Sequence, residues 1–342
     1  MITSSSTGFL QFFPISYYLS REFWSVESAE GVSMIPAASL KVSEGRNLYD
    51  VTVAEARGKP LLVVSGEAGA ATFDWEKIQA MLEGVSLPPA ATVSLSVDPL
   101  QVFTPHPSVT EKLGVEVNCA AVDGASGKLI GAAGDLFGCY VWDVETGKFL
   151  HNLSSNKDFL HSVTCVPGSS NLLVLGGEDG TVDFWDFKER ALVDRIDSKV
   201  AMTKSSSSSV HCWTSSTSAD AGGNFLAACG GAEGSWSDQN GLRGWVAYLH
   251  VSTRTLTSSA QTAVENNKII ASKAGWLTVG DEPVVNFWSC TKAQQVARPK
   301  STSSSSFGVY SMNDGVVVTG GSSNTIDVFV DRNLTFSLKC VV

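Results

Sequence analysis

Short apolar runs that lead into a glycine-rich turn recur along this chain. In the clearest copy, residues 172–186, the run LLVL is followed by a Gly-Glu-Asp-Gly turn and by a second apolar run that ends in Trp185 and Asp186. Asp-Gly favours a tight hairpin, because both central residues of such a turn need positive φ. The same arrangement spans residues 129–143, and its Trp142 precedes Trp185 by 43 residues. A period of roughly 40–45 residues with this pattern predicts the repeated four-stranded sheets of a propeller.

Weaker copies continue the series toward both ends of the chain. They lie at residues 61–75, 225–250, 276–288 and 316–329. Their strand-end positions Leu249, Trp288 and Phe329 are 39 and 41 residues apart, so the register holds through the C-terminal half. A seventh, degraded copy can be assembled from residues 9–12, 17–19 and 23–26. The prediction is therefore an all-β chain whose residues 1–342 form a single seven-bladed WD40-type β-propeller.

Residues 76–112 and 198–222 stretch the spacing between copies. We predict that both stretches are insertions, placed between blades or on their outer strands. In the first stretch Ile78, Met81 and Leu82 have helical spacing, and the prolines that follow interrupt regular structure. A short helix followed by a Pro-rich loop is expected there.

Three further segments lack the repeat pattern. Residues 1–8 are expected to be a flexible N-terminal tail. The serine-rich stretches 205–209 and 301–306 have the composition of low-complexity loops, which bury little apolar area. We expect both stretches to be mobile and assign them no chemistry.

The repeat also predicts which residues hold the blades together. A large aromatic side chain at the end of the third strand fills the gap between blades, and the turn aspartate accepts hydrogen bonds that tie the hairpin to the preceding strand. In full WD repeats an upstream histidine completes this polar network, but Asn156 stands at about that position here, so the network is incomplete. The predicted structural WD-repeat positions are Trp142, Asp143, Asp179, Trp185, Asp186, Trp288 and Phe329.

The charge of the chain argues against a nucleic-acid surface. The formal net charge is −10, and no cluster of Lys and Arg is present. Phosphate binding depends on such clusters, because they displace the counterions of the nucleic acid. Any link to RNA is therefore expected to run through a basic partner.

The cysteines and the hydropathy of the chain indicate a soluble intracellular protein. The seven cysteines are scattered and never spaced as C-x-x-C, which favours reduced thiols in a reducing compartment. No apolar run approaches the roughly 18 residues of a membrane span, and the N-terminus lacks the basic region of a secretory signal. No membrane association is expected.

Motifs for catalysis, cofactors and metals are missing from the sequence. The five histidines show no H-E-x-x-H or His-Cys spacing, and no G-x-S-x-G elbow is present. Residues 124–129 (GASGKL) resemble a phosphate-binding loop only superficially, since Leu129 replaces the Ser or Thr that would hold magnesium. We therefore predict no catalytic, cofactor-binding or metal-binding residues, and no enzymatic activity.

Several short segments have a more specific sequence than the general repeat. They are residues 116–120 (EVNCA), 143–147 (DVETG) followed by Phe149, 157–163 (KDFLHSV), 176–182 (GGEDGTV) with Trp185–Asp186, and 326–329 (IDVF) with 334–338 (LTFSL). Together these segments resemble the THO complex subunit 6 family, the WD-repeat member of the THO/TREX mRNA-export assembly. The last two of these segments, 326–329 and 334–338, distinguish the family best from other WD-repeat proteins, because those proteins do not share them. The resemblance runs from about residue 48 to the C-terminus, whereas residues 1–47 and both serine-rich stretches depart from the pattern.

The resemblance implies a non-catalytic scaffold in the nucleus. The propeller of this family docks on coiled-coil THO subunits and supports the assembly that couples transcription and splicing to nuclear mRNA export. The implied partners are other THO/TREX subunits, with RNA contact at most indirect and no small-molecule substrate. No nuclear-localisation run of Lys and Arg is visible, so nuclear entry would depend on partners. The partner-binding residues stay unknown at this stage.

Three other functions stay open. A substrate receptor of a cullin-type ubiquitin ligase is suggested by residues 185–188 (WDFK), which approximate the W-D-x-R ending of such receptors, although Lys188 cannot make the forked contacts of Arg. A generic interaction hub needs no further motif. A propeller enzyme would need convergent acids or a metal in a central channel, which the spacing does not indicate.

Overall fold

The structure is a computed structural model of the whole chain. It describes residues 1–4, 7–15, 32–87, 89–104, 116–133, 138–153, 158–169, 171–202, 210–233, 243–312 and 315–340. The chain divides into two compact units. Unit 1 comprises Met1–Ser28, Ser33–Val163 and Cys340–Val342, and unit 2 comprises Ala29–Val32 and Thr164–Lys339.

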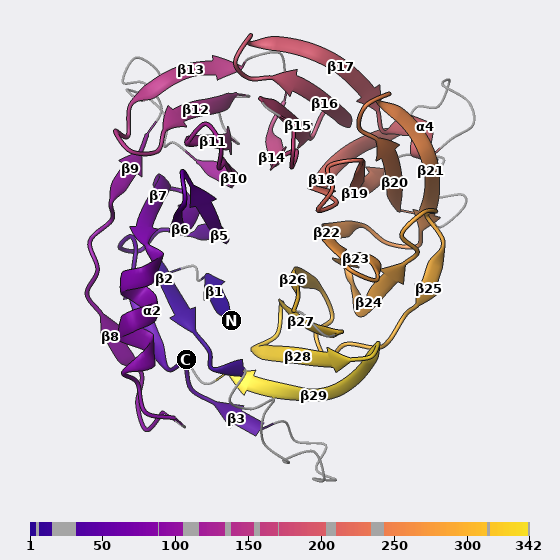
Figure 1. Ribbon diagram of the computed structural model, residues 1–342. Helices are drawn as coiled ribbons and strands as arrows, with labels where there is room; N and C mark the ends of the chain where they lie inside the picture. Colours follow the sequence, from indigo (N-terminus) through magenta and orange to yellow (C-terminus); the bar gives the residue numbers. More distant parts are fainter. Residues whose placement is uncertain are drawn as a thin grey trace. The chain divides into compact units, whose positions relative to one another are not determined.

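The described residues of unit 1 form three sheets, whose strands are labelled in Figure 1. The first contains, in spatial order, β1 (Ile2–Ser4), β2 (Phe9–Phe12), β4 (Ala38–Lys41) and β8 (Val93–Leu95). The second contains β5 (Leu48–Ala56), β6 (Lys59–Gly66), β7 (Gly69–Asp74) and β9 (Gln101–Phe103). The third contains β10 (Val117–Asp123), β11 (Lys128–Ala133), β12 (Cys139–Asp143) and β13 (Phe149–Leu153).

Four further sheets contain the strands from β14 (Leu160–Cys165) onward, and the last of them also takes in a strand from the N-terminal part of the chain. The first joins β14 to β15 (Leu172–Gly177), β16 (Thr181–Asp186) and β17 (Ala191–Asp197). The next two contain β18 (His211–Ala219), β19 (Phe225–Glu233), β20 (Gly244–His250) and β21 (Thr255–Thr262), and then β22 (Asn266–Ser272), β23 (Gly275–Gly280), β24 (Glu282–Trp288) and β25 (Gln295–Ala297). The last contains β26 (Ser306–Ser311), β27 (Val316–Gly321), β28 (Thr325–Val330), β29 (Asn333–Cys340) and, as a fifth strand, β3 (Val32–Met34).

Across the described residues, these seven sheets are the blades of a seven-bladed β-propeller, which confirms the predicted fold class. Four of the blades, those from β10 to β25, consist of strands that are consecutive in the sequence, as a repeat of hairpins requires. The inner strands of the blades are apolar on both faces; Leu173, Val174 and Leu175 of β15 are all fully buried. Strands covered on both faces read as continuous apolar runs, which is why the repeat was visible in the sequence.

The first blade is built differently from the degraded copy that the sequence suggested. Residues 9–12 form β2 as expected, but 17–19 and 23–26 lie outside the described residues. The blade instead takes β4 and β8, and β8 runs parallel to β4. Residues 2–4, expected in a flexible tail, form β1 and pair with β2, with Ile2 opposite Phe12. The pairing gives Ile2 an apolar cluster to pack against, which an exposed tail would lack.

The two stretches expected as insertions contain both helices and blade strands. Residues 76–112 include most of helix α2 (Trp75–Glu83), which confirms the predicted helix, and strands β8 and β9. Asp74 caps α2 by accepting a hydrogen bond from the Lys77 amide at 2.9 Å, and Ile78 is buried against the first two blades. Residues 198–222 include helix α4 (Lys199–Met202) and β18, the first strand of its blade. Within the described residues, no helix has the length and apolar character needed to cross a membrane.

A large side chain near the end of the third strand of a blade packs against the blade before it. Five such side chains lie in apolar clusters that join two neighbouring blades: Phe73, Trp142, Leu249, Trp288 and Phe329. We call these five residues the wedge residues. Trp142 is fully buried beside Phe103 of the preceding blade, with ring centroids 5.9 Å apart, and its Nε1 donates to the Thr104 carbonyl at 3.0 Å. Each wedge therefore covers apolar surface of two sheets at once.

The strand pairing changes at the same place. Opposite Trp142, Leu249, Trp288 and Phe329, and opposite Trp185, the fourth strand of the blade skips one residue in the pairing. In the β16–β17 pair, for example, Phe184 faces Asp194 while Trp185 faces Leu192. Such bulges increase the local twist of a sheet. Stacked blades need strong twist, and the bulge supplies it beside the bulky side chain.

Replacing a wedge residue should cost much of the stability of the protein. We expect Trp142→Ala to lower the free energy of unfolding by about 3–5 kcal/mol, because the change removes a buried ring and leaves a cavity between two blades. Urea unfolding followed by circular dichroism measures the loss. Val102→Ala on β9 is the control, because Val102 is exposed and belongs to the same unit. Equal losses in the two variants would contradict the wedge role.

Candidate interaction site

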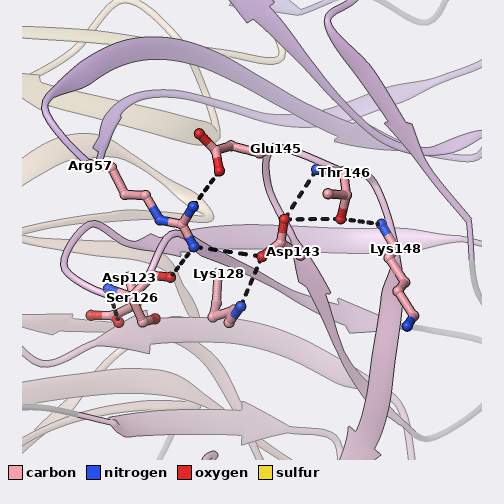
Figure 2. A network of polar contacts seen from close by, with 8 residues as sticks. All are labelled: Arg57, Asp123, Ser126, Lys128, Asp143, Glu145, Thr146 and Lys148. Carbon is pink, nitrogen blue, oxygen red and sulfur yellow. Dashed lines mark hydrogen bonds and ion pairs between the residues drawn. The ribbon is translucent and has the colours of Figure 1, made fainter.

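Three turns of unit 1 form a polar network, shown in Figure 2. It consists of Arg57, Asp123, Ser126, Lys128, Asp143, Glu145, Thr146 and Lys148, and we call it the turn network. Arg57 and Gly58 occupy the β5–β6 turn with φ of 49° and 80°, as a two-residue hairpin requires. The amide of Arg57 donates to the Gly124 carbonyl in the β10–β11 turn at 3.0 Å. The turns of two neighbouring blades are thereby joined.

Asp143 is the centre of the turn network. Its Oδ2 accepts a hydrogen bond from Lys128 Nζ at 2.9 Å and lies 3.7 Å from the Arg57 guanidinium. Its Oδ1 accepts from the amide and the hydroxyl of Thr146 at 3.1 and 3.0 Å. The hydrogen bond from Lys128, followed by those from Thr146, lowers the pKa of Asp143 to about 2. At neutral pH the carboxylate is therefore ionised, and both of its oxygens accept hydrogen bonds from within the chain.

The outer part of the network reaches from one blade to the next. The Arg57 guanidinium also forms an ion pair with the Glu145 carboxylate, and Gln101 Nε2 donates to the Glu145 carbonyl at 2.7 Å. A Cβ atom at Gly124 would lie 2.7 Å from the Glu55 carbonyl, so only glycine allows the two turns to approach this closely. The network has three basic and three acidic side chains, which balances its charge. Such an arrangement fixes two blades to each other and leaves no surplus charge for an ionic ligand.

A second group of polar residues is buried within the blades. Asp183, Asn286 and Asp327 each stand two residues before the large side chain at the end of the third strand, and each is almost fully buried. Asp183 receives Nε and Nη2 of Arg195 from the fourth strand at 2.7 and 2.5 Å. This fork of two hydrogen bonds raises the pKa of Arg195. The buried carboxylate is thus fully paired.

The equivalent positions in the last two blades use different partners. Asn286 donates from Nδ2 to Glu282 at 3.0 Å and accepts a hydrogen bond from Gln295 Nε2 at 2.5 Å. Arg298 then forms an ion pair with the other oxygen of Glu282. Glu282 lies on the same strand as Asn286, whereas Gln295 is on the fourth strand and Arg298 follows it. Buried polar groups at this position are therefore satisfied in every case described.

Asp327 is held by hydroxyl groups instead of a cation. Its carboxylate accepts hydrogen bonds from the hydroxyls of Ser301 (2.6 Å), Thr302 (2.7 Å) and Ser337 (2.5 Å), and from the Thr302 amide (2.6 Å). The prediction that residues 301–306 form a mobile loop is wrong, because Ser301, Ser303 and Ser306 are buried and the stretch is hydrogen-bonded to β28. Ser301 and Thr302 of this stretch are donors to a buried carboxylate.

The other sequence-predicted positions occupy turns and strand ends. Asp179 accepts from the amide and the hydroxyl of Thr181 at 3.1 and 2.8 Å, and Asp186 accepts from the amides of Lys188 and Glu189 at 3.0 and 2.9 Å. Trp185 is buried, and its indole nitrogen has no hydrogen-bond partner among the described residues. Asn156 lies outside the described residues.

These predicted positions do not converge on one site. Trp185, Trp288 and Phe329 of unit 2 belong to three different blades. Sequence reasoning also missed the buried polar positions, although a polar residue two places before the strand-end aromatic was visible in the repeats.

The described residues include side chains of the kinds that bind metals or act as nucleophiles. No three or more His, Cys, Asp or Glu side chains among them lie where they could hold a metal ion. None of the seven cysteines, all of them in the described part of the chain, forms a disulfide bond. Burial raises the pKa of Cys212 and of Cys340 to about 11 and also raises that of Cys229. These three thiols stay protonated at neutral pH and are poor nucleophiles.

One known protein family matches the greater part of the chain. The nucleolar protein 10-like, N-terminal domain, a β-propeller family, matches residues 122–331, more than half of the chain. The chain belongs to this family. The match begins at the end of β10 and ends just after β28. The matched region therefore includes Asp143 of the turn network and the buried polar residues Asp183, Asn286 and Asp327.

Individual relatives add a second similarity. THO complex subunit 6 homolog of Danio rerio is 24% identical over 233 residues, which are 67% of each chain. THO complex subunit 6 of Arabidopsis thaliana is 40% identical over 84 residues, 25% of this chain, and the match spans only 22% of the plant protein. The computationally designed protein Ika8 has the same fold, with a TM-score of 0.54, 16% identity, and coverage of 83% of this chain and 70% of that chain.

Replacing Arg195 alone should destabilise the protein more than replacing Asp183 and Arg195 together. We expect Arg195→Met to lower the free energy of unfolding by about 3–5 kcal/mol, because it leaves a buried carboxylate without a counter-ion. The double variant Asp183→Leu/Arg195→Met should recover most of the loss, since it leaves no buried charge. Urea unfolding of both variants provides the comparison. If the double variant is no more stable than Arg195→Met, the unpaired buried charge does not cause the loss of stability.

The Asp143 ion pair should make stability depend on acid pH. Because the folded-state pKa of Asp143 is lowered to about 2, its contribution is complete above the unfolded pKa and is lost as the pH falls through the folded value. The difference in unfolding free energy between wild type and Asp143→Asn should therefore shrink between about pH 4 and pH 2. Urea midpoints across this range measure it. Lys128→Met should flatten the dependence, and parallel pH profiles for wild type and Asp143→Asn would refute it.

Proposed function

We propose that the protein is a non-catalytic scaffold subunit of a THO complex, in the nucleus, where it supports the coupling of transcription and splicing to mRNA export. The observation that carries this proposal is the similarity to the Danio rerio THO complex subunit 6 homolog, which extends over two thirds of both chains. The plant THO complex subunit 6 supports it with higher identity over a shorter segment. The family to which the chain belongs is named after a nucleolar protein, which also favours a location in the nucleus.

The architecture supports binding of proteins as the activity. The wedge residues, the turn network and the buried polar pairs each use their functional groups within the chain. Loops and strand ends on such a rigid scaffold are where partner contacts are usually made. The net charge of −10 favours proteins over RNA as direct partners. We propose that other THO/TREX subunits, including coiled-coil subunits, are the partners and that RNA contact is indirect.

A second candidate function is a substrate receptor of a cullin-type ubiquitin ligase. WD repeat and SOCS box-containing protein 1 of Danio rerio is 41% identical over 49 residues, which are 14% of this chain and 12% of that protein. Trp185, Asp186 and Lys188 approximate the receptor ending, and Lys188 is exposed in the β16–β17 turn. The match is much shorter than that to the THO subunits, which favours the THO proposal.

Affinity purification tests the two functions together. The tagged full-length chain should recover the other THO subunits from native nuclear extract, at amounts comparable to its own by mass spectrometry. Lys188→Ala is the matched variant: it should leave THO recovery unchanged, whereas a ligase receptor would lose its adaptor. Recovery of a cullin adaptor without THO subunits would reject the THO proposal in favour of the second function. Separate nuclear and nucleolar fractions test the compartment.

A further inference from the structure

The first strands of three blades lie side by side within unit 2. Strand β18 contacts β22, and β22 contacts β26, as Figure 1 shows for these labelled strands. Each of the three is the edge strand of its sheet. The residues where these strands begin therefore belong to one continuous part of the surface, together with the neighbouring β15–β16 and β23–β24 turns.

Polar and aromatic side chains are linked across the start of β18. Glu178 of the β15–β16 turn lies 3.1 Å from His211 Nε2, and the His211 and Trp213 rings are 5.9 Å apart. Trp213 Nε1 donates to Glu265, which precedes β22, at 2.8 Å. Two carboxylates are thereby placed on either side of an aromatic pair, and each spans the gap between neighbouring blades.

The same line continues to β26. Asn267 Nδ2 donates to Asp281 Oδ1 at 3.1 Å and to the Ser306 carbonyl at 3.1 Å. Ser305 Oγ donates to the same Asp281 oxygen at 2.6 Å. Asp281 is exposed despite these contacts. The carboxylate is held at a fixed position beside the beginning of β26.

Two exposed aromatic side chains follow on β26. Phe307 is 58% exposed and Tyr310 is 65% exposed, the highest values among the exposed large hydrophobic residues of the described chain. Phe307 comes two residues after Ser305, the donor to Asp281. Large aromatic side chains are normally covered, so exposure of two on one six-residue strand marks a surface that a partner covers.

We propose that this surface binds an arginine-containing segment of a partner protein. We call it the acidic–aromatic surface and define it as Glu178, Trp213, Glu265, Asp281, Phe307 and Tyr310. A guanidinium group stacks on aromatic faces and donates forked hydrogen bonds to carboxylates, and both kinds of group are present. Nucleic acid would be repelled by the three carboxylates. The inference rests on the proposed protein-binding role and adds the chemistry of one partner segment.

Charge and chemistry together favour arginine over lysine. A lysine ammonium group can pair with Glu178 or Asp281, but it is a strongly hydrated point charge and cannot make the planar stack that an aromatic ring offers to a guanidinium. At one end of the surface, His211 Nε2 lies 3.1 Å from the Glu178 carboxylate. Lys268 follows Asn267 on β22 and is the Lys or Arg residue closest in sequence to the acidic–aromatic surface.

Fluorescence anisotropy with the purified full-length chain tests the proposal. The probe is a labelled eight-residue arginine peptide, compared with a lysine peptide of the same length and with a single-stranded RNA oligonucleotide. The arginine peptide should bind most tightly, and Phe307→Ala and Tyr310→Ala should each weaken it by about tenfold, the size of a desolvated cation–π contact. Glu178→Gln should weaken binding and reduce its dependence on salt concentration.

Two control variants test whether binding depends on this surface or on any exposed acidic or apolar side chain. Val296→Ala removes an exposed apolar side chain on β25, and Glu189→Gln removes an exposed carboxylate in the β16–β17 turn, both in unit 2. Neither should change the affinity for the arginine peptide. Melting curves of all variants verify that each is folded.

The opposite results would overturn the proposal. They are equal binding of the lysine peptide, unchanged affinity in both aromatic variants, or tighter binding of the RNA. Recovery of THO subunits from nuclei by a chain that does not bind the arginine peptide would reject this surface and leave the proposed function standing. Binding of the peptide by a chain that recovers no THO subunits would do the reverse.

Discussion

Burial of one large side chain between neighbouring sheets is the contact on which the blades depend. A four-stranded sheet with two apolar faces is stable only when both faces are covered. Phe73, Trp142, Leu249, Trp288 and Phe329 cover them, each from the same place near the end of a third strand. A residue skipped in the fourth strand lies opposite four of these five. The side chain and the bulge act together, because a bulky residue needs space and a stacked blade needs twist.

The same geometry explains the buried polar residues. Side chains two positions apart on a strand point to the same face, so Asp183 shares a face with Trp185, and Asp327 shares one with Phe329. A polar group on that face is buried with its neighbour and must find partners there. Arg195 supplies them to Asp183 from the opposing strand, whereas Ser301, Thr302 and Ser337 supply them to Asp327. The two solutions differ in charge: one neutralises the carboxylate, and the other only hydrogen-bonds it.

The sequence predicted the repeated blades well and the exceptional parts poorly, for reasons that particular residues make clear. Glycine turns and strand-end aromatics repeat at a steady spacing, so the blades that contain Trp142, Trp185 and Trp288 were visible without a structure. The first blade was not, because its strands β4 and β8 come from distant stretches and β8 pairs in parallel over three residues. Composition also could not distinguish a serine linker from serines that hold a carboxylate 26 residues away along the chain. The acidic–aromatic surface was missed for the same reason: Glu178, Trp213 and Asp281 belong to three different blades, whose strands lie side by side only in the folded chain.

Acidic residues therefore play two different roles in this chain. Asp143, Asp183 and Asp327 are occupied by partners within the protein, and the turn network carries as many basic as acidic groups. Carboxylates used in this way stabilise the blades but attract nothing from solution, since their charge is already matched or buried. At the acidic–aromatic surface the Trp213 indole donates to Glu265, and the Asn267 amide and the Ser305 hydroxyl donate to Asp281. Asp281 is held by neutral donors at an exposed position, and the exposed Phe307 follows two residues after one of these donors, Ser305, so a carboxylate and an aromatic side chain are both available to a basic partner there.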